Sequence, residues 1–103
     1  MFNKVLIVDD HDAISKSVAQ VLTACHVKTI ENEQYCDAAF LKVKRAALDG
    51  VAFDAVITDL SFKKDHRSTN LESGEDLIAA LRQDFAELPI IVYSMKNQLQ
   101  KVN

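Results

Sequence analysis

The sequence contains very little glycine or proline, and no long hydrophobic run. Only 2 Gly and 1 Pro occur among 103 residues. This scarcity excludes collagen-like and low-complexity chains, and it argues against an all-β fold, which needs many tight turns. No apolar run approaches the roughly 18 residues of a membrane-spanning helix, so we expect no membrane segment. A chain of this length holds one hydrophobic core, and we expect residues 1–103 to form one domain.

Neither sign of charge dominates, and the cysteines and histidines form no metal-binding pattern. The 12 basic and 15 acidic residues give a net charge of −3, which disfavours sequence-independent binding to nucleic acid. Cys25 and Cys36 lack metal-ligand spacing, and the three histidines are scattered. Two aspartates interrupt the apolar stretch near the N-terminus, so it is no signal-peptide core. We therefore expect a cytoplasmic protein whose two cysteines are thiols buried on helix faces.

Short apolar runs indicate the strands of a parallel sheet. They span residues 5–8, 27–30, 55–58 and 90–93. The first, third and fourth are continuous and rich in β-branched residues, which is typical of central strands buried on both faces. Lys28 and Thr29 interrupt the second run, which suits an edge strand.

Between these runs, apolar residues recur at helical spacing in three segments. Asp12, Asn32 and Ser73 are the expected N-caps of the three helices. Gly50 is placed to end the second helix, and Pro89 stops the third before the last strand begins. Alternating strands and helices predict an α/β fold: an open, doubly wound parallel sheet with helices on both faces.

Acidic residues follow the predicted central strands. In open α/β sheets, ligands bind beyond the carboxyl ends of the strands. The first strand ends in Asp9 and Asp10, the third ends at Asp59, and the fourth ends at Ser94. Taken singly, each aspartate is more often a helix cap or a turn residue. Together they predict three converging carboxylates, whose repulsion a divalent cation such as Mg²⁺ would relieve. A carboxylate beside Mg²⁺ can also act as a nucleophile toward phosphorus.

In four segments the chain resembles the receiver (CheY-like) domain of bacterial two-component response regulators. The segments are 5–11, 53–60, 74–78 and 88–94, in the family's order and at nearly its spacing. The triplet Asp9–Asp10–His11 is most similar to the subgroup with a helix-turn-helix output domain. The resemblance implies a flavodoxin-like sheet of order 2-1-3-4-5, of which this chain would form 2-1-3-4 and lack the fifth strand and last helix.

The resemblance also implies a role for each residue of the site. Asp59 would be the phosphoacceptor, and it would bind Mg²⁺ directly together with Asp10. Asp9 would act through a metal-bound water, and the backbone carbonyl of Ser61 would complete the ligands. The hydroxyl of Ser94 would sense the phosphoryl group. The donor would be a sensor histidine kinase, and the chain would be a signalling domain rather than an enzyme. DNA would be bound, and transcription regulated, only through an output domain absent from this chain.

Several features depart from the family pattern and leave a second function open. The family's lysine and aromatic residue of the fifth strand have no counterpart here, and Lys63 stands where a proline is usual. A missing fifth strand would leave an unpaired edge and bare apolar surface near Ile14 and Val18, so we expect a fragment of a longer protein or a homodimer. The alternative function is a degenerate receiver that serves as a phosphorylation-independent interaction or dimerisation module.

The basic segment 63–67 is either a partner contact or a solvated loop. His11 either tunes the response of the acidic pair to pH or starts the first helix.

Overall fold

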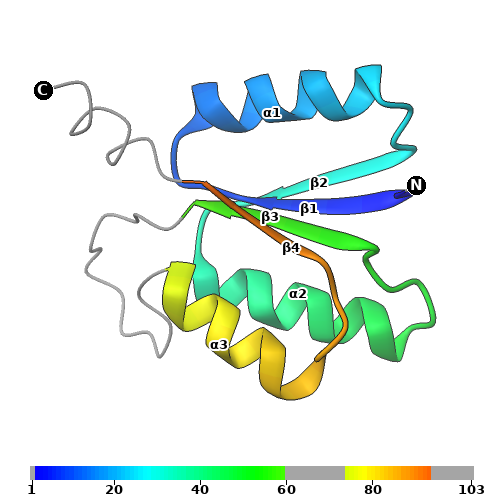
Figure 1. Ribbon diagram of the computed structural model, residues 1–103, viewed down its shortest axis with the longest axis vertical. Coiled ribbons are helices and arrows are strands. Elements are labelled where there is room, and N and C mark those ends of the chain that lie inside the picture. The colour runs from blue at the N-terminus through cyan, green and yellow to red at the C-terminus, as the bar shows by residue number, and fades with distance from the viewer. Residues whose placement is uncertain (1, 60–73, 94–103) are drawn as a thin grey trace, which may run out of the picture.

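Four parallel strands form the sheet at the centre of the computed structural model of the chain (Figure 1). The structure describes residues 2–59 and 74–93. Across the sheet, the strands are β2 (Thr29–Glu33), β1 (Lys4–Val8), β3 (Ala55–Asp59) and β4 (Ile90–Tyr93). The order 2-1-3-4 confirms the predicted topology.

The strand register brings the carboxyl ends of the central strands to one level. The pairing of β1 with β3 runs as far as Val8 opposite Thr58, and that of β3 with β4 ends with Asp59 opposite Tyr93. The next residue after β1, Asp9, therefore lies at the same edge of the sheet as Asp59. The register alone places two carboxylates side by side.

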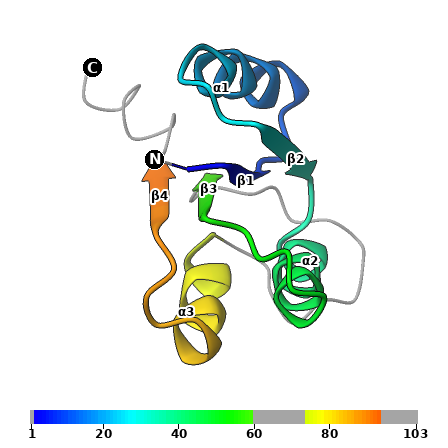
Figure 2. The ribbon, with the colours of Figure 1, turned by 90° about the vertical axis from the view of Figure 1, so that its right-hand side faces the viewer.

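Helices cover both faces of the sheet (Figures 1 and 2). One face carries α1 (Asp12–Ala24), and the opposite face carries α2 (Cys36–Leu48) and α3 (Gly74–Asp84). This is the doubly wound arrangement that right-handed crossovers produce in a parallel sheet. Within the described residues, no helix is long and apolar enough to cross a membrane.

Apolar side chains of β1 and β3 alternate between two cores, because successive side chains of a strand point to opposite faces. The smaller core, under α1, contains Val5, Ala55 and Ile57, with Val18 and Leu22 packed against them. The larger core lies under α2 and α3 and consists of Leu6, Val8, Cys36, Ala39, Val43, Ala46, Phe53, Val56, Leu77 and Leu81. Both central strands are thus buried on both faces, as predicted.

The predicted second strand, residues 27–30, is misplaced. A turn that follows α1 occupies the start of that range. His26 adopts a left-handed conformation with φ of 68°, and the N–H of Val27 donates to the carbonyl of Leu22 at 3.1 Å. The strand begins only at Thr29, whose N–H donates to the carbonyl of Asn3 at 2.8 Å. The prediction that β2 lies at an edge is confirmed.

Two of the predicted helix caps are wrong. The N-cap of α1 is His11, and Asp12 is the first helical residue. The N-cap of α2 is Tyr35, because Asn32 belongs to β2. The end of α2 is confirmed: Gly50 follows the C-cap and has φ of 78°, a conformation that glycine adopts without steric cost. Ser73 lies outside the described residues.

The last strand and one cysteine are more exposed than predicted. In β4, Ile91 is 47% and Val92 40% exposed, since β3 is the only neighbour of β4 among the described residues. An apolar run indicates a strand, but it does not tell whether the strand has one neighbour or two. Cys36 is buried as predicted, whereas Cys25 is exposed because it lies in the C-cap of α1.

Candidate functional site

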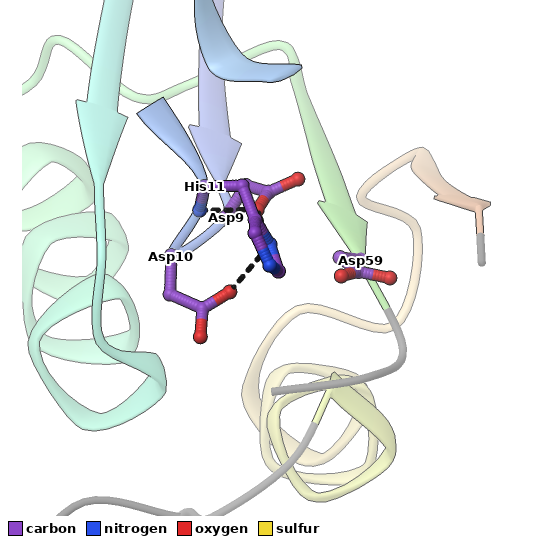
Figure 3. Close-up of side chains that lie close together, drawn as sticks. All are labelled: Asp9, Asp10, His11 and Asp59. Atoms are coloured by element: carbon purple, nitrogen blue, oxygen red, sulfur yellow. Dashed lines mark hydrogen bonds and ion pairs between the residues drawn. The ribbon is translucent and has the colours of Figure 1, made fainter. Parts of the chain in front are cut away.

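Three carboxylates and one imidazole gather at the carboxyl edge of the sheet (Figure 3). Asp9, Asp10 and His11 form the connection from β1 to α1, and Asp59 ends β3. One ligand atom from each of these four residues lies within 4.8 Å of all the others. The convergence of carboxylates that the sequence predicted is therefore present.

The cluster has a buried floor and a more open mouth. Asp9 is 2% and Asp59 3% exposed, and the N–H of Asp9 donates to the carbonyl of Glu33 on β2 at 3.0 Å. The side chain of Asp10 is only partly buried, and that of His11 is 44% exposed. Carboxylates held this close together in a dry environment need compensating hydrogen bonds or cations.

His11 supplies part of that compensation. Its backbone N–H donates to Oδ1 of Asp9 at 2.7 Å. Its ring Nδ1 lies 3.1 Å from the same oxygen and 3.0 Å from Oδ1 of Asp10. The prediction that His11 starts the first helix is confirmed, and its side chain also belongs to the cluster. The position of His11 two residues after Asp9 is the sequence signal for this contact.

Tyr93 also belongs to the site and is absent from the predicted set. Its hydroxyl donates to Oδ2 of Asp9, so both oxygens of that carboxylate accept hydrogen bonds. Burial raises the pKa of the Tyr93 phenol, and the hydrogen bond to Asp9 raises it further. The available signal is that Tyr93 ends the fourth strand at the edge where the aspartates gather.

Two other polar groups near the cluster are structural. The hydroxyl of Thr58 donates to the backbone carbonyl of Asp59 at 3.0 Å within the core. Burial raises the pKa of the Cys36 thiol to about 12, and the negative charges of Asp37 and Asp76 contribute. The thiol therefore stays protonated at neutral pH, and Cys36 acts as a core residue rather than a nucleophile.

The donor set fits a hard divalent cation. Carboxylate oxygens are the ligands that Mg²⁺ prefers, and the partly exposed Asp10 leaves room for metal-bound water. A cation would also offset the repulsion among three neighbouring carboxylates. The cluster is therefore able to bind a metal ion. Ser61, Ser94 and the basic segment 63–67 lie outside the described residues.

The fold and this cluster together define a class of protein: an open α/β domain of flavodoxin-like order, with a phospho-aspartate type of acidic site at its carboxyl edge. The chain belongs to the response regulator receiver domain family, whose sequence model matches residues 5–103.

Solved structures of receiver domains are similar to this chain. RcsB from Salmonella enterica serovar Typhimurium, bound to promoter rprA with the phosphomimetic BeF3⁻, is 26% identical, with a TM-score of 0.65. The match covers 89% of this chain and 42% of RcsB, so this chain spans less than half of that relative.

A receiver domain from a plant has a similar fold. The receiver domain of the histidine kinase CKI1 from Arabidopsis thaliana, complexed with Mg²⁺ and BeF3⁻, is 17% identical with a TM-score of 0.64. That match covers 97% of this chain and 74% of the CKI1 chain. A comparison with curated protein sequences finds no match.

Proposed function

We propose that residues 1–103 form a receiver domain that accepts a phosphoryl group on Asp59 from a sensor histidine kinase, with Mg²⁺ as cofactor. The convergence of Asp9, Asp10 and Asp59 within 4.8 Å is the observation that supports this proposal. The family match supports a signalling role, in which the domain catalyses at most its own phosphorylation and dephosphorylation.

In this proposal each carboxylate has its own role. Asp10 and Asp59 would bind Mg²⁺ directly, Asp9 would bind it through a water, and the backbone carbonyl of Ser61 would complete the protein ligands. Bound Mg²⁺ would neutralise charge on the transferring phosphoryl group. A carboxylate oxygen of Asp59 forms the new bond to phosphorus, while the bond from phosphorus to the donor's leaving atom breaks. The burial of Asp59 limits access of water to the nucleophile.

The hydroxyl of Ser94 then reports the phosphoryl group to a partner or output surface. Ser94 directly follows Tyr93, which lies opposite Asp59 in the sheet. Mg²⁺ and BeF3⁻ in the CKI1 complex support the metal, and the DNA-bound state of RcsB supports transcriptional output through a separate domain. We place this activity in the cytoplasm, where sensor kinases present their phosphorylated histidines.

A second candidate function is a phosphorylation-independent interaction or dimerisation module. The exposed apolar side chains of Ile91 and Val92 on β4 favour it, because an apolar strand at the edge of the described sheet is suited to pairing with another chain. The structure of two RcsB dimers bound to DNA shows that a similar protein assembles as a dimer.

Phosphorylation by a small donor separates these two functions. Incubation with acetyl phosphate and MgCl2 should add the mass of one phosphoryl group, and Asp59→Asn should abolish the gain. Asp12→Asn is the matched control, because Asp12 is exposed and forms an ion pair with Lys16, outside the cluster. No mass gain in the wild-type chain, or a gain that persists in Asp59→Asn, would reject the proposed phosphoacceptor.

A further inference from the structure

The imidazole of His11 lies against the carboxylates of Asp9 and Asp10 and does not cap the helix (Figure 3). As N-cap of α1 it makes no side-chain capping hydrogen bond. Its backbone is instead tied to Asp9 by the N–H···Oδ1 bond of 2.7 Å, and the ring turns toward the carboxylates. The ring atom that faces the carboxylates is Nδ1. It is a nitrogen atom, whereas Mg²⁺ prefers oxygen ligands.

The distance from Nδ1 to Asp10 matches that between neighbouring ligands of one octahedral ion. Metal–ligand bonds of about 2.1 Å at right angles separate two ligand atoms by about 3.0 Å and opposed ligands by about 4.2 Å. Nδ1 lies 3.0 Å from Oδ1 of Asp10, a proposed direct ligand, and 3.1 Å from Oδ1 of Asp9, which in the proposed function bonds to a metal-bound water. The spread of the four donor atoms, at most 4.8 Å, allows opposed positions to be filled as well.

We propose that His11 is a nitrogen ligand of the cation in this site, bound through Nδ1, and that it shifts the preference of the site from Mg²⁺ toward divalent transition-metal ions. The proposal rests on the metal site of the proposed function. Imidazole suits transition metals, whereas carboxylate and water suit Mg²⁺. An imidazole added to the carboxylate ligands should therefore make the site bind Co²⁺ and Ni²⁺ more tightly than Mg²⁺.

The same distances also describe a histidine that only pairs with two carboxylates. The two roles differ in how metal affinity responds when the ring is removed. An imidazole ligand contributes most to the binding of metals that favour nitrogen. Its loss should therefore lower the affinity for Co²⁺ far more than the affinity for Mg²⁺. A residue that only positions Asp9 and Asp10 would change both affinities by similar factors.

Calorimetric titrations of His11→Ala with CoCl2 and with MgCl2 measure this difference. We expect a loss of at least about tenfold in Co²⁺ affinity, since altering even the residues that support metal ligands costs about 10- to 100-fold, with Mg²⁺ affinity changed much less. His26→Asn is the matched control, because His26 is an exposed histidine and asparagine tolerates its left-handed backbone. The control should leave both affinities unchanged.

Pulsed EPR of the Mn²⁺-loaded chain provides a readout that does not depend on affinity. Directly bound nitrogen should give a ¹⁴N coupling in the wild type and in His26→Asn, and none in His11→Ala. Equal losses for Co²⁺ and Mg²⁺, or a ¹⁴N coupling that survives in His11→Ala, would overturn the role of His11. Mg²⁺ binding without any ¹⁴N coupling would overturn this inference alone, whereas the absence of all metal binding would also overturn the proposed metal site.

Discussion

Neutralising one carboxylate of the cluster should stabilise the metal-free protein and remove its response to metal. Asp10→Asn keeps the size of the side chain and deletes one charge. Asp10 is the suitable position because its side chain is only partly buried, whereas Asp9 is fully buried and Asp59 is the proposed phosphoacceptor. The change should raise the free energy of unfolding in the absence of divalent cations.

The size of the effect follows from the geometry of the cluster. Two unit charges 4.8 Å apart repel by about 3.5 kcal/mol at an effective dielectric constant of about 20, and by about 0.9 kcal/mol in bulk water. The substitution removes the repulsion between Asp10 and two other carboxylates. It also removes the attraction between Asp10 and the His11 ring, whose Nδ1 lies 3.0 Å away. We expect a net stabilisation of about 1 to 3 kcal/mol, which corresponds to several degrees in Tm for a domain of this size.

Magnesium should stabilise the wild type much more than the Asp10→Asn variant. A ligand present at about 100 times its Kd stabilises the folded state by about 2.7 kcal/mol. The wild type should gain this amount from Mg²⁺, while Asp10→Asn should gain little, since it lacks a proposed ligand. The difference in stability between them should therefore shrink or reverse when Mg²⁺ is added.

Urea unfolding of the wild type and of Asp10→Asn, each with and without MgCl2, measures the four free energies of unfolding. Asp12→Asn is again the control, and it should follow the wild type in both conditions because Asp12 is exposed and outside the cluster. A lower stability of metal-free Asp10→Asn, or an equal gain from Mg²⁺ in the variant and the wild type, would refute the account of the cluster as three repelling carboxylates that share one cation.

Three further changes test individual contacts. Tyr93→Phe removes the hydroxyl that donates to Asp9, and it should lower the free energy of unfolding by about 1.5 to 3 kcal/mol, the usual range for a hydrogen bond to a charged group; an unchanged urea midpoint would contradict the contact. Because the Cys36 pKa is raised from 9.0 to about 12, the unfolded chain loses its thiol proton first as pH rises. Stability should therefore fall between pH 9.0 and about 12, and Cys36→Ala should flatten that part of the profile. A thiol reagent at neutral pH should modify the exposed Cys25 far faster than Cys36, and equal rates would contradict the burial of Cys36. Gly50→Ala should destabilise the chain by about 1 kcal/mol in thermal unfolding, since φ of 78° strains alanine although no atom lies within 4 Å of the added methyl group. A Tm equal to that of the wild type would show that the turn relaxes.

The sequence predicted the acidic edge because each aspartate ends a continuous apolar run. Parallel pairing then brings the ends of β1 and β3 together without further information. His11 and Tyr93 are different, since their contacts with Asp9 depend on the path of the loop after β1 and on the reach of a side chain from β4. Such contacts come from tertiary structure and have no periodic signal.

Local conformation explains the other errors. The second strand starts late because His26 takes a left-handed conformation that is uncommon for residues other than glycine, and that no apolar pattern reveals. The exposure of Ile91 and Val92 depends on how many neighbours β4 has, which its own residues do not encode. The cap predictions fail for a similar reason. Asp12 and Asn32 are good cap residues, but Asp12 is already the first residue of α1 and Asn32 is still part of β2, so the extent of the strands and helices decides the caps.

The central claim is that Asp9, Asp10 and Asp59 bind one cation as a unit. The most direct measurement is a MgCl2 titration followed by the backbone-amide NMR shifts of the chain. A single saturable site should give its largest shifts at residues 9–11 and 58–59, which lie on separate strand ends, and Asp59→Asn should weaken or abolish the response at both segments. Unchanged spectra, or shifts confined to one of the two segments, would contradict the claim.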